Sequence, residues 1–207
     1  MARSPNAPPP RPAPRLYLVT PPVGPVERFA GALRAAVGAT DVAAVLLKLE
    51  PAGERELTNR VKTLAGLVQP TGAALLLDGH VEIAGRAGAD GAHLTGIEAF
   101  TAAVDGLKPA IRAMVAGERG ADYVMFGELE ADGSRPSFNA ILDRVTWWAE
   151  LFEVPCVAYA AALDEVGPLA AAGADFVAIG GGIWDDQRGP AAAVTDAAAK
   201  LAVPEKV

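Results

Sequence analysis

Cysteine is nearly absent from this chain of 207 residues, in which Cys156 stands alone. One cysteine cannot form an intramolecular disulfide, so a reducing compartment such as the cytoplasm is expected. No apolar run is long enough for a membrane-spanning helix, and the start of the chain lacks the apolar core of a signal peptide. We therefore expect a cytoplasmic protein that has no membrane partner.

Basic residues are also scarce, with 18 Lys and Arg against 25 Asp and Glu, for a net charge of −7. Setting aside Arg3, Arg11 and Arg15, which lie in or beside a proline-rich start, leaves 15 basic against 25 acidic residues. Such an acidic surface repels phosphate backbones, so no nucleic-acid partner is expected. A phosphorylated small molecule is not excluded, because it needs only a local pocket.

The chain divides into a short lead-in and one domain. Residues 1–14 are rich in proline, which is typical of a disordered or extended segment. Residues 15–207 have the length of one ordinary domain, and with 51% hydrophobic residues the chain can bury a substantial core.

Short apolar runs of the buried-strand type alternate with helical patterns along this domain. Strands are predicted over 16–20, 42–48, 73–77, 90–94, 123–126, 154–159 and 176–179. Helices are predicted over 25–37, 54–68, 81–87, 97–107, 110–118, 137–152, 164–172 and 190–201. This alternation predicts a parallel sheet, and its many copies favour a closed (β/α)8 TIM barrel.

One strand is missing from the pattern. The predicted helices 97–107 and 110–118 follow each other with no strand-like run between them. We therefore expect the fifth strand to be short or missing, with a short or irregular closure near residues 108–112.

Two kinds of glycine mark opposite ends of the predicted strands. Gly88, Gly120 and Gly173 each open a Gly-Ala-Asp turn before a strand, which is typical of a helix end and predicts a structural role. Gly180 to Gly182 instead follow the last strand, where barrels of this kind carry their chemistry. Bare backbone N–H groups there predict a phosphate site, and a glycine-rich turn without a ligand is the alternative.

Several segments, in order, resemble the thiamine-phosphate synthase and TenI family: LYLVT (16–20), GADGAHL (88–94), GADYVMFG (120–127), VPCVAYAA (154–161) and GADFVAIGGGI (173–183). The resemblance spans nearly the whole chain from Arg15 on, and it implies a TIM barrel. The family's synthase joins hydroxymethylpyrimidine diphosphate to thiazole phosphate in thiamine biosynthesis and releases pyrophosphate, with Mg²⁺ on the diphosphate. The resemblance therefore implies a transferase that binds phosphorylated small molecules and Mg²⁺.

Matching the family's motifs residue by residue implies three groups of site residues. The catalytic position is Lys48, which stands where the family has an arginine. Asp78 and Glu98 are the implied ligands of Mg²⁺. The implied substrate-binding residues are Gly180, Gly181, Gly182, Ile183, Asp78, His93, Gly127 and Arg135. For His93, a hydrogen-bonded structural histidine is the simpler alternative.

Other family positions are substituted, so the active site is degenerate. Glu50 stands at a lysine position, Glu128 at a proline position, and Ala160-Ala161 replace a Gly-Gly pair. A diphosphate carries about three negative charges and requires Lys, Arg or a metal, and this site offers few cations. We therefore expect little or no synthase turnover. Two functions stay open: a slow or altered synthase, and a non-catalytic TenI-like barrel that binds a phosphorylated ligand or a partner protein.

Three tryptophans add smaller expectations. Trp147 and Trp148 lie on one predicted helix, so at least one should face the core. The other would then be an interface residue, which leaves a homo-oligomer open. Trp184 follows the glycines and should either cover the pocket or pack against the last helix.

Overall fold

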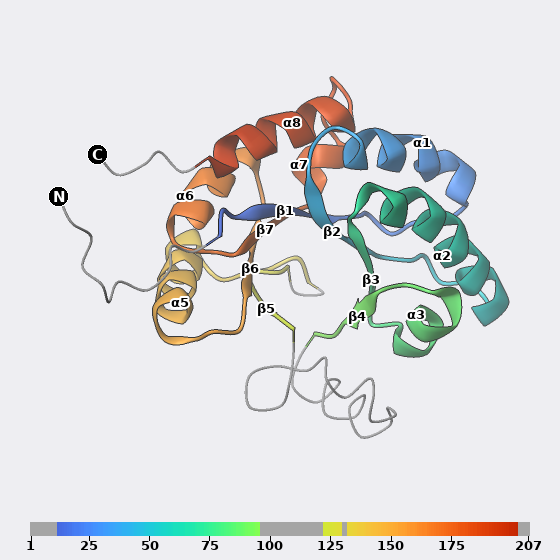
Figure 1. Cartoon of the computed structure of the whole chain (residues 1–207), viewed down its shortest axis with the longest axis horizontal. Coiled ribbons are helices and arrows are strands. Elements are labelled where there is room, and N and C mark those ends of the chain that lie inside the picture. Colours follow the sequence, from blue (N-terminus) through green and yellow to red (C-terminus); the bar gives the residue numbers. More distant parts are fainter. Residues whose placement is uncertain (1–11, 96–121, 130–131, 203–207) are drawn as a thin grey trace.

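The computed structural model describes residues 12–95, 122–129 and 132–202. Seven parallel strands form one curled sheet in the order β4-β3-β2-β1-β7-β6-β5 (Figure 1). The strands are β1 (Arg15–Val19), β2 (Val42–Leu47), β3 (Ala74–Asp78), β4 (Gly91–His93), β5 (Val124–Phe126), β6 (Cys156–Ala160) and β7 (Phe176–Ile179). The seven strands predicted from the apolar runs are thereby confirmed.

Helices connect the strands and cover the outer, convex side of the sheet (Figure 1). They are α1 (Val26–Val37), α2 (Glu54–Val68), α3 (Val81–Ala87), α5 (Phe138–Leu151), α6 (Val166–Ala171), α7 (Gly181–Trp184) and α8 (Pro190–Leu201). Two 3-10 turns, η1 (Gln69–Thr71) and η3 (Leu163–Glu165), precede β3 and α6. In the described part of the chain, no helix combines the length and the apolar character needed to cross a membrane.

The closed barrel is confirmed only in a coarser form, because the described sheet is an open half-barrel. Its two ends are β4 and β5, and each of these strands has a single hydrogen-bonded strand neighbour in the described sheet. The predicted helices 97–107 and 110–118 and the irregular closure near 108–112 lie outside the described residues. So does most of the proline-rich lead-in.

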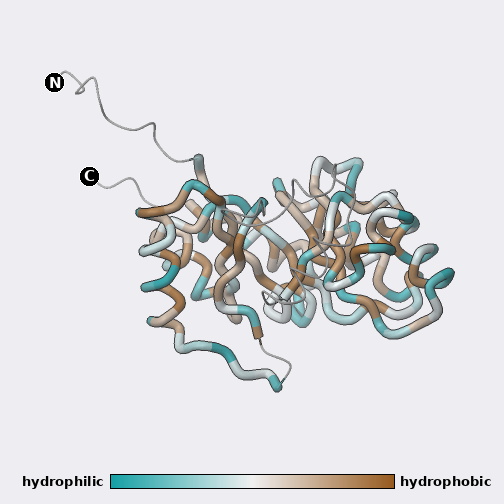
Figure 2. The backbone as a smooth tube through the Cα atoms, turned by 90° about the horizontal axis from the view of Figure 1, so that it is seen from below, coloured by the Kyte–Doolittle hydropathy of each residue, from teal (hydrophilic) through white to brown (hydrophobic). Residues whose placement is uncertain are grey.

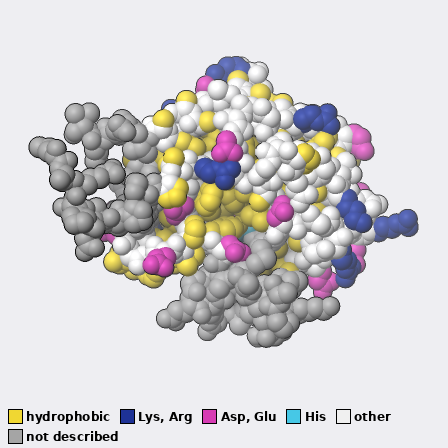
Figure 3. Space-filling model, in the orientation of Figure 1, with side chains coloured by type: hydrophobic (Ala, Val, Ile, Leu, Met, Phe, Trp, Pro, Cys, Tyr) yellow, Lys and Arg dark blue, Asp and Glu magenta, His cyan; other side chains and the backbone are white. Residues whose placement is uncertain are grey.

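The core has two layers, because successive side chains of a strand point to opposite faces. In β1, Leu16 and Leu18 belong to the cluster between sheet and helices, whereas Tyr17 and Val19 belong to the cluster inside the curl. Hydrophobic segments run through the interior of the backbone trace (Figure 2), and hydrophobic side chains gather at the centre of the face seen in Figure 3. The inside of the half-barrel is therefore largely apolar.

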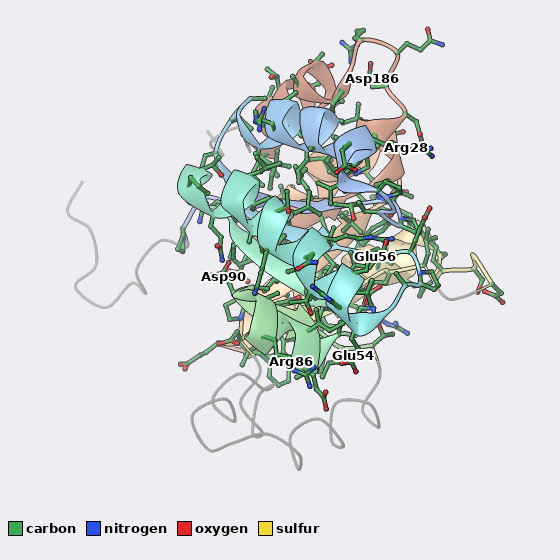
Figure 4. All side chains as sticks on the ribbon, turned by 90° about the vertical axis from the view of Figure 1, so that its right-hand side faces the viewer. Arg28, Glu54, Glu56, Arg86, Asp90 and Asp186 are labelled. Carbon is green, nitrogen blue, oxygen red and sulfur yellow. The ribbon has the colours of Figure 1, made fainter. Side chains whose placement is uncertain are left out.

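The Gly-Ala-Asp turns are structural where they are described. Gly88 and Gly173 have left-handed φ angles of +77° and +100°, as expected for residues that end a helix. The carboxylates then hold the neighbouring strand: Asp90 Oδ2 accepts from the N–H of Leu75 at 2.7 Å, and Asp175 Oδ2 from the N–H of Cys156 at 2.8 Å. Asp90 lies at the opposite end of the strands from Glu54 and Glu56 (Figure 4).

One of the two tryptophans of α5 faces the core and the other is exposed, as expected. Trp148 packs against the core and donates from Nε1 to the carbonyl oxygen of Val154 at 2.7 Å. Trp147 is 52% exposed, and the exposed Leu151 and Phe152 follow it. The interface role of this surface stays a prediction.

Candidate functional site

A cavity of about 210 Å³ opens where β1, β2, β6 and β7 end. In barrels of this type, catalytic residues come from the carboxyl ends of several strands. Ten residues line the cavity: Val19, Thr20, Pro21, Pro22, Lys48, Tyr159, Gly180, Gly181, Trp184 and Asp185. The structure therefore brings Lys48 and the first two glycines of the predicted phosphate site to one place.

Lys48 is held by its backbone. Its N–H donates to Thr20 Oγ1 at 3.0 Å, and its carbonyl accepts from the N–H of Val23 at 2.9 Å. The loop after β1 is thereby fixed to the residue after β2. The Lys48 side chain is 38% exposed, and its Nζ lies 4.0 Å from Asp78 Oδ2. The cavity therefore has a solvated cation at its rim, partly compensated by one carboxylate.

The three glycines form the start of α7 rather than an irregular loop. The N–H groups of Gly181 and Gly182 lie in the first turn of the helix, where no intrahelical acceptor exists. Gly180 leaves little room for a side chain, because a Cβ there would lie 3.2 Å from both Tyr159 Oη and the carbonyl oxygen of Val19. Asp185 lines the same cavity and opposes an anion.

Ile183 and Trp184 complete this turn in different ways. Ile183 is fully buried, and its N–H donates to the carbonyl of Gly180 at 2.9 Å. Trp184 donates from Nε1 to the carbonyl oxygen of Val19 at 2.7 Å, and its ring lies 4.8 Å from the ring of Phe29 in α1. Trp184 is therefore a wall of the cavity that ties α7 to β1 and α1.

Arg135 is engaged by a carboxylate instead of being open to a ligand. Its Nη2 lies 2.8 and 2.9 Å from the two carboxylate oxygens of Glu165, and both side chains are mostly buried. Glu165 Oε2 also accepts from the N–H of Ala161 at 2.8 Å. One donor is left over: Arg135 Nη1 is buried and has no hydrogen-bond partner among the described residues.

His93, at the end of β4, is buried and bonded on both ring nitrogens. Nδ1 lies 2.8 Å from Tyr123 Oη, and Nε2 lies 3.1 and 3.2 Å from the carboxylate oxygens of Glu128. Tyr123 Oη lies 2.9 Å from Tyr17 Oη. This geometry fits the structural alternative for His93. From the sequence, Glu128 is predicted only as an acid after a strand, at a position where the resemblance implies proline. Its pairing with His93, 35 positions earlier, has no local sequence signal.

Burial favours the neutral form of these two tyrosines. The pKa of Tyr17 is raised well above 10, first by burial and then by Tyr123. The pKa of Tyr123 is also raised, and burial is again the largest cause. Both phenols are therefore hydrogen-bonding groups at ordinary pH.

Gly127 has a packing explanation. Its φ is +86°, and a Cβ would lie 2.8 Å from Cδ1 of Ile141 in α5. A side chain is therefore excluded on two grounds that involve no ligand. The predicted substrate role of Gly127 stays a prediction.

The described residues provide one of the two implied magnesium ligands. Asp78 lies at the end of β3, whereas Glu98 is outside the described residues. Across the described ranges, no three His, Cys, Asp or Glu side chains converge on one point. Mg²⁺ is often held by one or two carboxylates together with substrate phosphates, and Asp78 fits that sparse arrangement.

Comparison with known proteins gives a consistent picture. Residues 16–183 match the family model described as thiamine monophosphate synthase. The chain is 42% identical over 197 residues to a thiamine-phosphate synthase of Rhodospirillum centenum, covering 88% of this chain and 95% of that one. It is 35% identical over 205 residues to one of Hyphomonas neptunium, covering 89% and 92%. A solved structure, thiamine phosphate pyrophosphorylase from Pyrococcus furiosus, has a similar fold, with a TM-score of 0.68, 21% identity, and 90% and 95% of the two chains covered.

Proposed function

The chain belongs to the thiamine monophosphate synthase family, and from that premise we propose that it joins hydroxymethylpyrimidine diphosphate to thiazole phosphate with low turnover. In this reaction the thiazole nitrogen forms a bond to the pyrimidine's methylene carbon, and the bond from that carbon to the diphosphate oxygen breaks. Pyrophosphate leaves. Charge stabilisation of the leaving group is the main demand on the protein.

The observation that carries the proposal is the cavity at the ends of β1, β2, β6 and β7. It combines the Lys48 ammonium with the N–H groups at the start of α7. A cation and the N–H donors of a first helical turn suit a phosphate group. Magnesium, held by Asp78 and by the diphosphate itself, would supply further positive charge to the leaving group.

We expect low turnover because Arg135, the other cation of the predicted site, is already paired with a carboxylate. Arg135 is paired with Glu165, which also occupies the N–H of Ala161. Asp185 adds a negative charge to the cavity. In the part of the mouth that the structure describes, Lys48 is therefore the main cation that a diphosphate would meet.

Purified protein incubated with both substrates and Mg²⁺ tests the proposal. We expect slow formation of thiamine phosphate and pyrophosphate in equal amounts, and a further loss of at least tenfold in the Lys48→Met variant, because a charged hydrogen bond contributes roughly 1.5–3 kcal/mol. Arg55→Met, an exposed basic residue at the start of α2, is the control and should leave the rate unchanged. Fast turnover would contradict the low rate, and a Lys48 variant as active as wild type would contradict the role of the lysine.

The engaged state of Arg135 also favours a second function, binding without catalysis. A TenI-like barrel of this kind would retain a phosphorylated ligand or a partner protein. The same incubation, together with a binding titration with pyrophosphate, separates the two functions. Tight binding of pyrophosphate with no product would support the binding function and exclude the synthase.

A further inference from the structure

Glu128 occupies an unusual position for an acid that follows a strand. It comes directly after the Gly127 turn at the end of β5, and both carboxylate oxygens lie within 3.2 Å of Nε2 of the buried His93. Its side chain is 26% exposed, against 8% for His93. The carboxylate is thus anchored on one side and open on the other.

One protonation state gives the whole network a single direction. With Glu128 as a carboxylate, which only accepts, His93 Nε2 carries the proton that faces Glu128. With His93 as the neutral imidazole, Nδ1 accepts from the hydroxyl of Tyr123. Tyr123 Oη is then the acceptor in its bond with Tyr17. Each donor along this line has one acceptor, and His93 can neither rotate nor change tautomer without breaking a bond.

Glu128 keeps acceptor capacity beyond its bond to His93. A carboxylate has about four lone-pair positions, and a single N–H uses one of them or is shared between two. The Glu128 side chain is 26% exposed, so part of it can be reached from solvent. A ligand N–H, or a positive charge, would find a pre-oriented acceptor there.

The hydrogen-bond network of Glu128 adjoins the cavity. Tyr17, at the far end of the network, belongs to the same inner cluster as Val19 and Tyr159, and both of these residues line the cavity. Burial raises the pKa of Tyr159, Arg135 lowers it, and Glu128 raises it. The Lys48 side of the mouth therefore suits an anion, and the Glu128 side suits a donor or a cation.

We propose that Glu128 determines substrate specificity. Its carboxylate accepts a hydrogen bond from an N–H donor on the heteroaromatic ring of the substrate, while the phosphates of that substrate occupy the cavity. His93 is the residue that positions Glu128. The inference rests on the proposed function and adds the orientation of the substrate to it. The resemblance implies a proline in the family at the position of Glu128, so we assign this contact to this chain alone.

Calorimetric titration of the full-length protein with two probes tests the proposal. The probes are pyrophosphate and hydroxymethylpyrimidine, an aminopyrimidine without phosphate. We expect Glu128→Gln to weaken hydroxymethylpyrimidine binding about tenfold or more, as for loss of a charged hydrogen bond, and to leave pyrophosphate binding unchanged. Lys48→Met should show the opposite pattern. Glu153→Gln, an exposed acid after α5, is the matched control and should change neither affinity.

The outcomes distinguish failure of the Glu128 inference from failure of the proposed function. If the wild-type protein binds neither probe, the proposed function fails. If it binds both, and Glu128→Gln binds hydroxymethylpyrimidine as wild type does, the role of Glu128 is wrong and the function stands. If Glu128→Gln loses both probes, Glu128→Asp decides: pyrophosphate binding that survives while hydroxymethylpyrimidine binding falls supports the inference, and equal loss of both overturns it.

The positioning role of His93 has its own readout. Nitrogen NMR of the wild-type imidazole should show a protonated Nε2 and a bare Nδ1. Tyr123→Phe removes the donor to Nδ1, so we expect a mixture of tautomers and a severalfold higher KM for the pyrimidine substrate with little change in kcat. An unchanged tautomer together with an unchanged KM would show that His93 is only structural.

Discussion

Gly127 shows how two separate constraints can act on a single residue. Its φ of +86° is unfavourable for any other residue, and a Cβ would contact Cδ1 of Ile141 at 2.8 Å. Gly133 has a similar φ of +80°, but a Cβ there would meet nothing within 4 Å. The pair therefore separates backbone strain from steric overlap.

We predict that Gly127→Ala destabilises the protein more than Gly133→Ala does. Both variants carry the strain of a left-handed residue, about 1–2 kcal/mol. Only Gly127→Ala adds overpacking against Ile141, typically about 1–3 kcal/mol. Urea unfolding of the two variants measures the difference. Equal losses of unfolding free energy would mean that Ile141 moves aside without cost.

The buried tyrosines predict an upper limit to the pH range of full stability. The folded-state pKa values of Tyr17 and Tyr123 lie above the ordinary value of 10.0. The unfolded chain therefore loses these protons at lower pH than the folded protein does. Their contribution to stability is complete below about pH 10 and is lost as the pH rises from there through the folded-state pKa values.

Urea unfolding at several pH values from 8 to 11 measures this loss. The steepest possible slope is about 1.4 kcal/mol per pH unit for each tyrosine. Lysines also titrate in this range, so Tyr123→Phe is the control, and its unfolding free energy should fall less steeply above pH 10. The same slope in both proteins would assign the loss to other groups.

At the scale of an element, the side chain of Asp90 attaches β3 to the turn that opens β4. Asp90 Oδ2 accepts from the Leu75 N–H at 2.7 Å and from Gln69 Nε2 at 3.0 Å. We predict that Asp90→Ala lowers the unfolding free energy by about 1–3 kcal/mol, because the N–H of the fully buried Leu75 loses its acceptor. Asp90→Asn keeps an oxygen at this position and should lose much less. Thermal unfolding measures both variants, and equal losses would show that the charge matters instead.

The elements that the sequence predicts best are those with a complete local pattern. Apolar residues at helical spacing predict α2, and Gly88 predicts the end of α3, with the bounds that the structure shows. The helical turn at Gly181 is harder to foresee, because glycine disfavours helices and the turn depends on Trp184 reaching back to Val19. The bond between Arg135 and Glu165 joins residues 30 positions apart, and no local pattern encodes it.

The predicted site also contains some contacts that the sequence pattern implies and others that it does not. Lys48, Gly180 and Gly181 meet in one cavity because parallel strands end at one edge, which the strand pattern already implies. The pairing of His93 with Glu128 depends instead on how β4 and β5 approach each other at the two ends of the sheet. That approach depends on the curl of the whole sheet, which a sequence pattern does not give.

At the scale of the whole molecule, the strands of the half-barrel differ in how many neighbouring strands they pair with. β1 and β2 lie at the centre of the order, and each pairs with a strand on both sides. β4 and β5 have three residues each and, within the described sheet, pair on one side only. Between these two ends, the described contacts include the side-chain bonds from His93 to Tyr123 and to Glu128. The two end strands are therefore held by a few side-chain contacts, whereas the central strands are held by many backbone hydrogen bonds.

We predict that amide hydrogens exchange fastest in β4 and β5 and slowest in β1 and β2, because local opening needs the least free energy where few backbone bonds and little buried surface must be disrupted. His93→Asn removes the link to Tyr123 or to Glu128, so exchange in β5 should accelerate at least tenfold while β1 stays unchanged. Hydrogen exchange followed by mass spectrometry resolves these segments. Exchange of β5 as slow as that of β1 in the wild-type protein would show that its other edge is covered in solution, whereas a uniform acceleration in His93→Asn would show that the half-barrel opens as a single unit.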